Sequence, residues 1–448
     1  MDRVQPPLNF IAPAFNPWVL RLARLSLPIW LRSRADLAEI DGVNLDRLVK
    51  QYDRFQKGEI RLMLAFRHPN PKDPFCLGHL MWNLLPQGAK AQGVSLSSPT
   101  HFHFIYDRGI PLWAGSVVEW LFPKLGGTPI QRGKLDWVGL RSARNLFANG
   151  EFPLAAAPEG GTNGHNEIIS PLEPGVAQLG FWCVEDVRQA GGSQEVIILP
   201  VGIRYSYLNA PWSQVDALLD RLETEMGLDP LSAGDRYDRL YRLGGKLLVV
   251  MERFYRESYQ RPLPKDTDLP QSNEEMATRV RELLDNALSV AEEYFGLKAR
   301  GTVIDRCRRL EQAGWDRIYR DDFEHLAKVS PIERGLADRI AEEADLRMWH
   351  MRVVEHFVAV TGSYVRENPT VERFADTAIL LWKTFEQIQG KTTRTPHLGS
   401  QKARVTIGEP ISVSDRWETY SASRRSGKQA VDDLTQDLRT ALEATIDN

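Results

Sequence analysis

The sequence has few of the features that mark secreted, membrane-spanning or metal-binding proteins. Its three cysteines, Cys76, Cys183 and Cys307, are far apart and odd in number. They form neither a disulfide framework nor a metal-ligand spacing, so we expect a reducing, cytoplasmic setting. No apolar run approaches the roughly 18 residues that a membrane span needs, and no apolar segment behind a basic start indicates a secretory leader.

Net charge is also small. The 56 basic and 59 acidic residues give a formal net charge of −3, which argues against nucleic acid as a partner. The composition is that of an ordinary globular protein, with 42% apolar and 26% charged residues. With 448 residues, the chain is long enough for one to three domains of roughly 150 residues.

The pattern of secondary structure changes twice along the chain. Residues 60–208 alternate short apolar strands with helical segments, which is typical of a layered α/β domain. Residues 209–400 show helical periodicity and almost no strand pattern, whereas residues 401–448 contain one more strand and an amphipathic helix. The strands expected in the first region are Ile60–Phe66, Thr128–Gln131, Pro153–Ala157 and Val196–Leu199.

The late strand determines the predicted architecture. Ala403, Val405 and Ile407 alternate with polar residues, and a lone strand must pair with a sheet that lies elsewhere in the chain. We therefore predict an α/β fold, a three-layer mixed sheet with flanking helices, interrupted by a large all-helical insertion. Residues 1–208 and 401–448 form the α/β domain, with residues 1–59 as a helical N-terminal part, and residues 209–400 form the insertion.

A basic amphipathic segment, residues 16–34, lies near the start of the chain. It contains four arginines and no acidic residue. Such a helix can lie in a membrane interface, or it can pack on the domain with a bend at Pro28. The pattern leaves both open. Four apolar residues recur at helical spacing: Trp18, Leu22, Leu25 and Ile29.

A histidine and a carboxylate follow the first strand, in the segment FRHPNPKDP. His68 comes after the strand, and Asp73 comes five residues later, at the start of the next helix. A carboxylate that fixes the tautomer of a histidine allows the ring to act as a general base. Asp73 followed by Pro74 is also an ordinary helix start, so the pair alone does not establish a site.

Three further positions lie beside strand ends. Arg132, in GGTPIQRG, could bind a phosphate or be an ordinary surface arginine. Glu159, in APEGGTNG, lies where open α/β sheets bind their ligands, although Gly160 also suits a plain turn. Pro200, in ILPVGIRY, can end a buried strand.

In order and chemistry, these positions together resemble the glycerophospholipid acyltransferase family, which includes lysophosphatidate and glycerol-phosphate acyltransferases. The strand VTIGEPI is similar to the closing strand of that family. The resemblance covers residues 60–208 and 401–448, under half of the chain. Four blocks match in order: His-x4-Asp at His68 and Asp73, an arginine block at Arg132, Pro-Glu-Gly at Pro158, Glu159 and Gly160, and a proline block at Pro200.

The resemblance implies transfer of an acyl group from acyl-CoA or acyl carrier protein to the free hydroxyl of a lysophosphatidate-like glycerolipid. His68 would take the proton of the hydroxyl, and Asp73 would orient His68. It further implies a peripheral enzyme on the cytoplasmic face of a membrane, without a metal or a bound cofactor. The residues expected to bind substrate are Arg132 at the phosphate, Glu159, Gly160 and Thr162 at the glycerol, and Pro200 at the acyl donor.

This chain departs from the family pattern around the acceptor. Arg67 and Asn70 replace a usual asparagine and serine, and Asn163 replaces a usual arginine. A neutral or sugar-bearing lipid acceptor is therefore an alternative. Another is a catalytically weak relative that binds lipid or membrane, with the helical region as a partner-docking module. Hydrogen-bond distance between His68 and Asp73 beside an apolar tunnel would favour the enzyme.

Other chemistries have less support. His101 and His103, in THFHF, would share a strand face, but no third metal ligand lies nearby in the sequence. The chain has no Gly-x-Ser-x-Gly segment, which argues against a serine hydrolase or lipase.

Overall fold

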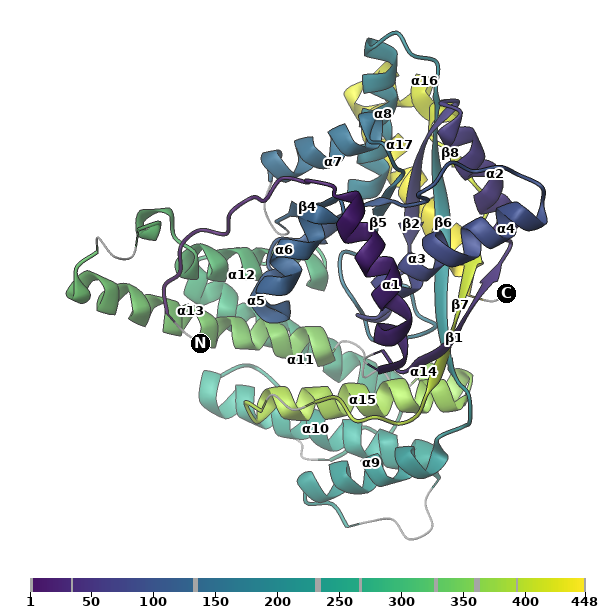
Figure 1. Ribbon diagram of the computed structural model, residues 1–448. Helices are drawn as coiled ribbons and strands as arrows, with labels where there is room; N and C mark the ends of the chain where they lie inside the picture. The colour runs from purple at the N-terminus through teal and green to yellow at the C-terminus, as the bar shows by residue number, and fades with distance from the viewer. Residues whose placement is uncertain are drawn as a thin grey trace. The chain divides into compact units, whose positions relative to one another are not determined.

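The chain folds into two units that differ in secondary structure, as a computed structural model shows (Figure 1). One unit comprises Phe10–Leu208 and Ser400–Asn448 and contains the sheet. The other comprises Met1–Asn9 and Asn209–Gly399 and is built from helices. The structure describes residues 3–33, 35–131, 136–229, 235–265, 268–325, 329–357, 363–391 and 394–446.

A mostly parallel sheet forms the centre of the first unit. Its order is β1-β7-β6-β2-β5-β3-β4, with β8 also paired to β6. Of the pairings between these strands, β6 with β7 and β6 with β8 are antiparallel, and the others are parallel. The strands are β1 (Leu37–Val43), β2 (Ile60–Phe66), β3 (His103–Asp107), β4 (Gly127–Ile130), β5 (Leu154–Ala156), β6 (Glu195–Tyr207), β7 (Gln401–Ile407) and β8 (Ile411–Ser412).

Helices flank this sheet and bury its apolar strands. In β2, Leu62 and Leu64 belong to a core shared with α1–α4, whereas Met63 and Ala65 belong to a core shared with α7, α8 and α17. Alternate residues of a strand point to opposite faces, so a strand buried on both faces is apolar throughout. The helices are α1 (Pro17–Ser33), α2 (Leu45–Gln56), α3 (Asp73–His79), a π-helical turn (Leu80–Leu84), α4 (Leu85–Ala91), α5 (Ile110–Ala114), α6 (Ser116–Lys124), α7 (Trp137–Asn149), α8 (Gly175–Gln189), a 3-10 turn (Ser414–Arg416), α16 (Trp417–Ala422) and α17 (Arg424–Glu443).

The second unit is helical in its described residues, apart from one isolated bridge. Ser272 and Ser330 cap two of its helices, because their Oγ atoms accept hydrogen bonds from the amides of Glu275 at 3.1 Å and Glu333 at 3.2 Å. The helices are α9 (Trp212–Glu225), α10 (Arg236–Tyr259), α11 (Asn273–Phe295), α12 (Val303–Ile318), a 3-10 turn (Asp321–Phe323), α13 (Pro331–Phe357), α14 (Ser363–Glu367) and α15 (Val371–Ile388).

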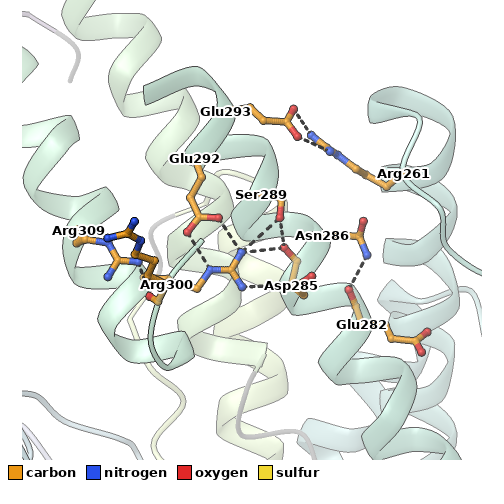
Figure 2. Close-up of polar contacts among 10 residues, drawn as sticks. Arg261, Glu282, Asp285, Asn286, Ser289, Glu292, Glu293, Arg300 and Arg309 are labelled. Carbon is orange, nitrogen blue, oxygen red and sulfur yellow. Dashed lines mark hydrogen bonds and ion pairs between the residues drawn. The ribbon is translucent and has the colours of Figure 1, made fainter. Parts of the chain in front are cut away.

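Buried ion pairs join three successive helix pairs of the second unit. In each, an arginine of the later helix donates two hydrogen bonds of 2.6–3.2 Å to a buried glutamate of the earlier helix. Figure 2 shows one of these glutamates, Glu292, with Asp285 and Ser289 on the same helix. The pairs are Arg239 with Glu223, Arg279 with Glu252, and Arg306 with Glu292.

The N-terminal segment Met1–Asn9 belongs to the helical unit, whereas the sequence interpretation assigned all of residues 1–59 to the α/β domain. Val4 is buried in a small core with Phe323 and Ala337. The amide of Gln5 donates a hydrogen bond of 2.7 Å to the carbonyl of Ile318. These are tertiary contacts with residues far away in the sequence, which no local pattern encodes.

Candidate active site

The turn between β2 and α3 brings His68 and Asp73 together. The strand ends at Phe66, and Asp73 is the first residue of α3. Nδ1 of His68 lies 2.8 Å from Oδ2 of Asp73. The amide of Asn70 donates a hydrogen bond of 2.9 Å to the same oxygen, which closes the turn around the carboxylate.

Asp73 is fully buried, and both its oxygens accept hydrogen bonds. The hydroxyl of Tyr205, on β6, donates to Oδ1. Burial raises the pKa of Asp73, while the hydrogen bonds from His68, Tyr205 and Asn70 oppose that shift by favouring the carboxylate. An ionised Asp73 holds the proton of His68 on Nδ1, which leaves the lone pair on Nε2.

His68 is the part of this pair that reaches the surface. Its side chain is 22% exposed, whereas that of Asp73 is completely buried. Among the residues that the structure describes, none forms a hydrogen bond with Nε2 of His68. The free lone pair of Nε2 can therefore accept a proton from a bound molecule, which is the geometry of a general base.

Glu159 supports His68 from the loop after β5. Its Oε1 accepts a hydrogen bond of 2.9 Å from the amide of His68. Its Oε2 accepts hydrogen bonds from the amide of Ser170, at 2.9 Å, and from Nδ2 of Asn163, at 3.2 Å. Burial raises the pKa of Glu159, against the effect of the hydrogen bonds from the amides of His68 and Ser170. Glu159 thus connects the loop to the backbone of His68.

Arg67 is a functional candidate that the sequence interpretation missed. Its guanidinium is fully buried and donates to the carbonyl oxygens of His165 and Ile168, both at 2.7 Å, and of Asn166. The group fixes residues 165–168 next to the turn that carries His68. The only signal in the sequence is a charged residue directly after an apolar strand, where it was noted as a departure from the family pattern.

The other predicted substrate residues of this loop are Gly160 and Thr162. Gly160 has a φ of +68°, in the left-handed region that favours glycine. Thr162 is exposed. The loop meets the His68 turn where the amide of Gly164 donates to the carbonyl of Pro69 at 3.2 Å. Arg132 lies outside the described residues.

Pro200 does not end its strand, which corrects the sequence interpretation. β6 continues to Tyr207, and Pro200 pairs in register with Ala65 of β2. Its carbonyl accepts a hydrogen bond of 2.8 Å from the amide of Gly408, between the segments that pair with β8 and with β7. The missing N–H of proline therefore falls where the antiparallel ladder is already interrupted.

Cys76, His101 and His103 are buried in the core of the α/β unit, and their contacts indicate a role in the fold. Burial raises the pKa of the Cys76 thiol to about 12, which makes it a poor nucleophile. Nε2 of His101 donates to the carbonyl of Leu125 at 2.9 Å, and Nδ1 of His103 lies 3.1 Å from the carbonyl of Gly126. In the described part of the chain, no group of three His, Cys, Asp or Glu side chains could hold a metal ion.

A cavity of about 460 Å³ in the α/β unit lies away from His68. It is lined by residues of α1 and α4 and by the segment after α4, among them Arg24, Lys90 and Leu96. None of the predicted site residues lines it. The apolar tunnel that we associated with an enzyme is therefore not this cavity.

Comparisons with protein-family models, with curated proteins and with solved structures found no match for this chain. The described helices include none that is long and apolar enough to cross a bilayer. What can be said of function therefore depends on the geometry of the site and on the motifs.

Proposed function

We propose that the protein is an acyltransferase that moves a fatty acyl group from acyl-CoA or acyl carrier protein to the free hydroxyl of a lysophosphatidate-like glycerolipid. The observation that carries this proposal is the His68–Asp73 hydrogen bond, with Asp73 buried and the side chain of His68 partly exposed. The order of the four sequence blocks supports the same reaction.

In the proposed mechanism, Nε2 of His68 takes the proton of the acceptor hydroxyl while the oxygen attacks the thioester carbonyl. Asp73 stabilises the imidazolium that forms, because its carboxylate lies 2.8 Å from Nδ1. As the tetrahedral intermediate collapses, the C–S bond breaks, and the thiolate leaves with the proton from His68. General-base help of this kind typically contributes ~10²–10⁴ in rate.

The remaining residues would position the substrates. We assign Arg132 to the acceptor phosphate or another anionic head group, and Pro200 to the wall of the acyl-donor site. Gly160 and Thr162 lie on the loop that meets the His68 turn, which supports a role near the glycerol. The engaged carboxylate of Glu159 supports a role in bracing His68 better than direct contact with the glycerol hydroxyls. The mechanism needs no metal or bound cofactor.

We also infer that the α/β unit is a three-layer fold and that residues 209–400 are an insertion in it. The two separate cores that share the β2 residues support the three layers. Strand β7, which follows the helical unit in the chain and pairs with β6 and β1, supports the insertion. A peripheral position on the cytoplasmic face of a membrane would suit an enzyme whose acceptor is a lipid.

The test is thiol release from acyl-CoA and from acyl carrier protein, with lysophosphatidate in detergent micelles as acceptor. We expect release that requires the acceptor and that falls by ~10²–10⁴ in H68A. H79A is the matched control, because His79 is another partly buried histidine, at the end of α3, that pairs with Asn83. H79A should keep its activity.

Absence of release with both donors would contradict the proposal, as would release that is equal in wild type and H68A. Circular dichroism of each variant shows whether a loss of activity reflects unfolding. The alternative acceptors are tested by a panel of neutral and sugar-bearing lipids, for which substitution of Arg132 should have little effect.

A further inference from the structure

Helix α1 has two apolar faces, and only one of them is buried. Its inner face contributes Leu20, Leu27 and Leu31 to the core of the α/β unit. At 3.6 residues per turn, the four apolar residues of the other face fall within a sector of about 60° on the opposite side. They are between 66 and 70% exposed: Trp18, Leu22, Leu25 and Ile29. The helix therefore packs on the domain, which is one of the two alternatives that the sequence left open, but it does so through its other face and not through this stripe.

The neighbouring helices also have exposed apolar residues. Leu112 of α5 and Val117 and Trp120 of α6 are each exposed by half or more. The start of α1 is joined to the end of α6, since the amide of Asn16 donates to the carbonyl of Lys124 at 2.8 Å (Figure 1). Single exposed apolar residues are ordinary, whereas a complete helix face with exposed neighbours marks an interaction surface.

The charges on α1 indicate what covers its exposed face. Arg21 and Arg32 are exposed and lie along one edge of the apolar stripe, and the helix contains no acidic residue. The guanidinium of Arg21 lies 5.2 Å from the centre of the Trp18 ring. Leucine and isoleucine in the centre, tryptophan at one end and arginines along the border are the arrangement of a helix that lies in the interface of an anionic bilayer.

Helix α1 also packs on the helix that begins with Asp73. The ring of Trp30, on α1, stacks on that of Phe75, on α3, with centroids 6.4 Å apart and planes inclined by 19°. Phe75 lies two residues after Asp73. The exposed helix is thus coupled directly to the helix that holds the carboxylate of the His68–Asp73 pair.

We propose that α1, with α5 and α6 beside it, is a docking surface for a bilayer that contains anionic phospholipid. The apolar stripe enters the interface, Arg21 and Arg32 contact the phosphates, and α3 is held next to the surface. The further role, to present His68 to a lipid acceptor in that surface, rests on the proposed function.

The experiment is flotation of the full-length protein with vesicles of phosphatidylcholine alone, or mixed with phosphatidylglycerol. Wild type should float with the mixed vesicles. The triple variant L22Q/L25Q/I29Q should lose at least ~10-fold in partitioning, because it replaces three aliphatic groups that would be buried in the bilayer. R21Q/R32Q should partition ~10-fold less onto the mixed vesicles and almost as well as wild type onto phosphatidylcholine alone, since the contacts that it loses are electrostatic.

The matched control is I332Q/L336Q on α13, where both residues are similarly exposed, at 77% and 65%. This variant should float like wild type. Equal flotation of wild type and the triple variant would overturn the proposal. A wild-type dimer that becomes a monomer in the triple variant would also overturn it, because the face would then be covered by a second copy of the chain.

The outcome is separable from that of the acyl-transfer assay. H68A should float like wild type, since docking does not use the imidazole. Flotation that needs the α1 stripe, without any thiol release, would support docking and contradict the acyltransferase. Thiol release in micelles, without flotation, would support the enzyme and overturn the docking surface.

Discussion

Residue 205 is the clearest example of a side chain that acts on the candidate site through another. The buried hydroxyl of Tyr205 donates to Asp73 and lies 3.4 Å from Sγ of Cys76. Asp73 in turn contacts His68. The orientation of the carboxylate toward the imidazole therefore depends on a strand that is 132 residues away in the sequence.

We expect Y205F to change the pH dependence of thiol release. A donor to a carboxylate favours its charged form, so removal of the hydroxyl raises the pKa of Asp73 further above its usual range. Activity should then fall at a higher pH on the acid side than in wild type, with a loss of roughly tenfold near neutral pH.

The control for this prediction is Y207F, on the same strand. A merely structural role of Tyr205 would lower activity equally at all pH values. An acid limb that is the same in wild type and Y205F would thus contradict a positioning role.

His101 should make folding sensitive to pH. Burial lowers the pKa of His101 to about 4 from an ordinary value of 6.5, so between these values the unfolded chain binds more protons. The stability that the neutral ring provides is present above pH 6.5 and is lost as the pH falls toward 4. The expected loss in the free energy of unfolding is about 3 kcal/mol.

Urea unfolding at a series of pH values measures this loss. In H101Q the amide can replace both hydrogen bonds of the ring without titrating, so its stability should fall less steeply than that of wild type. An exposed histidine, His325, provides the control variant H325Q. Parallel curves for wild type and H101Q would contradict the prediction.

The site was only partly predictable at this scale. His68 and Asp73 are five residues apart, so their contact depends on one local turn, and residue type and spacing suffice to propose it. Arg67 and Tyr205 are different, because their partners are carbonyls and a carboxylate from distant segments. Neither has a local pattern that distinguishes it from an ordinary buried residue.

At the scale of helices and strands, the apolar pattern predicted an element where most of that element's own side chains are buried. Ile60–Phe66 was predicted with both its ends. β1, with the sequence LAEIDGV, has two acids and a glycine and was missed, since its strand structure depends on pairing with β7.

The buried arginines of the helical unit lead to a prediction on stability. R279L leaves the carboxylate of Glu252 buried without its partner, which should cost roughly 3–5 kcal/mol. The double variant E252L/R279L removes both charges and should recover most of that loss, because a desolvated charge no longer remains.

Thermal or urea unfolding of the two variants is the measurement. E293Q, which removes the exposed partner of Arg261 (Figure 2), is the control and should cost at most about 1 kcal/mol. If the double variant is as unstable as R279L, the cost comes from lost packing and not from the unpaired charge.

At the scale of the whole molecule, the chain leaves the sheet after β6 and returns to it at β7. The alternation of Ala403, Val405 and Ile407 was enough to predict that return, because an isolated strand is not stable. The place of Met1–Asn9 in the helical unit could not be predicted, since it depends on tertiary contacts of Val4 and Gln5.

The position of β7 has a consequence for biosynthesis. Among the described strands β1 pairs only with β7, and residues 201–207 of β6 pair with β7 on one side. On the ribosome, these strands are made long before Gln401, so their backbone groups stay unpaired while the helical unit is translated. Exposed strand edges are prone to aggregate. The nascent chain should thus depend on chaperones most during synthesis of residues 209–399.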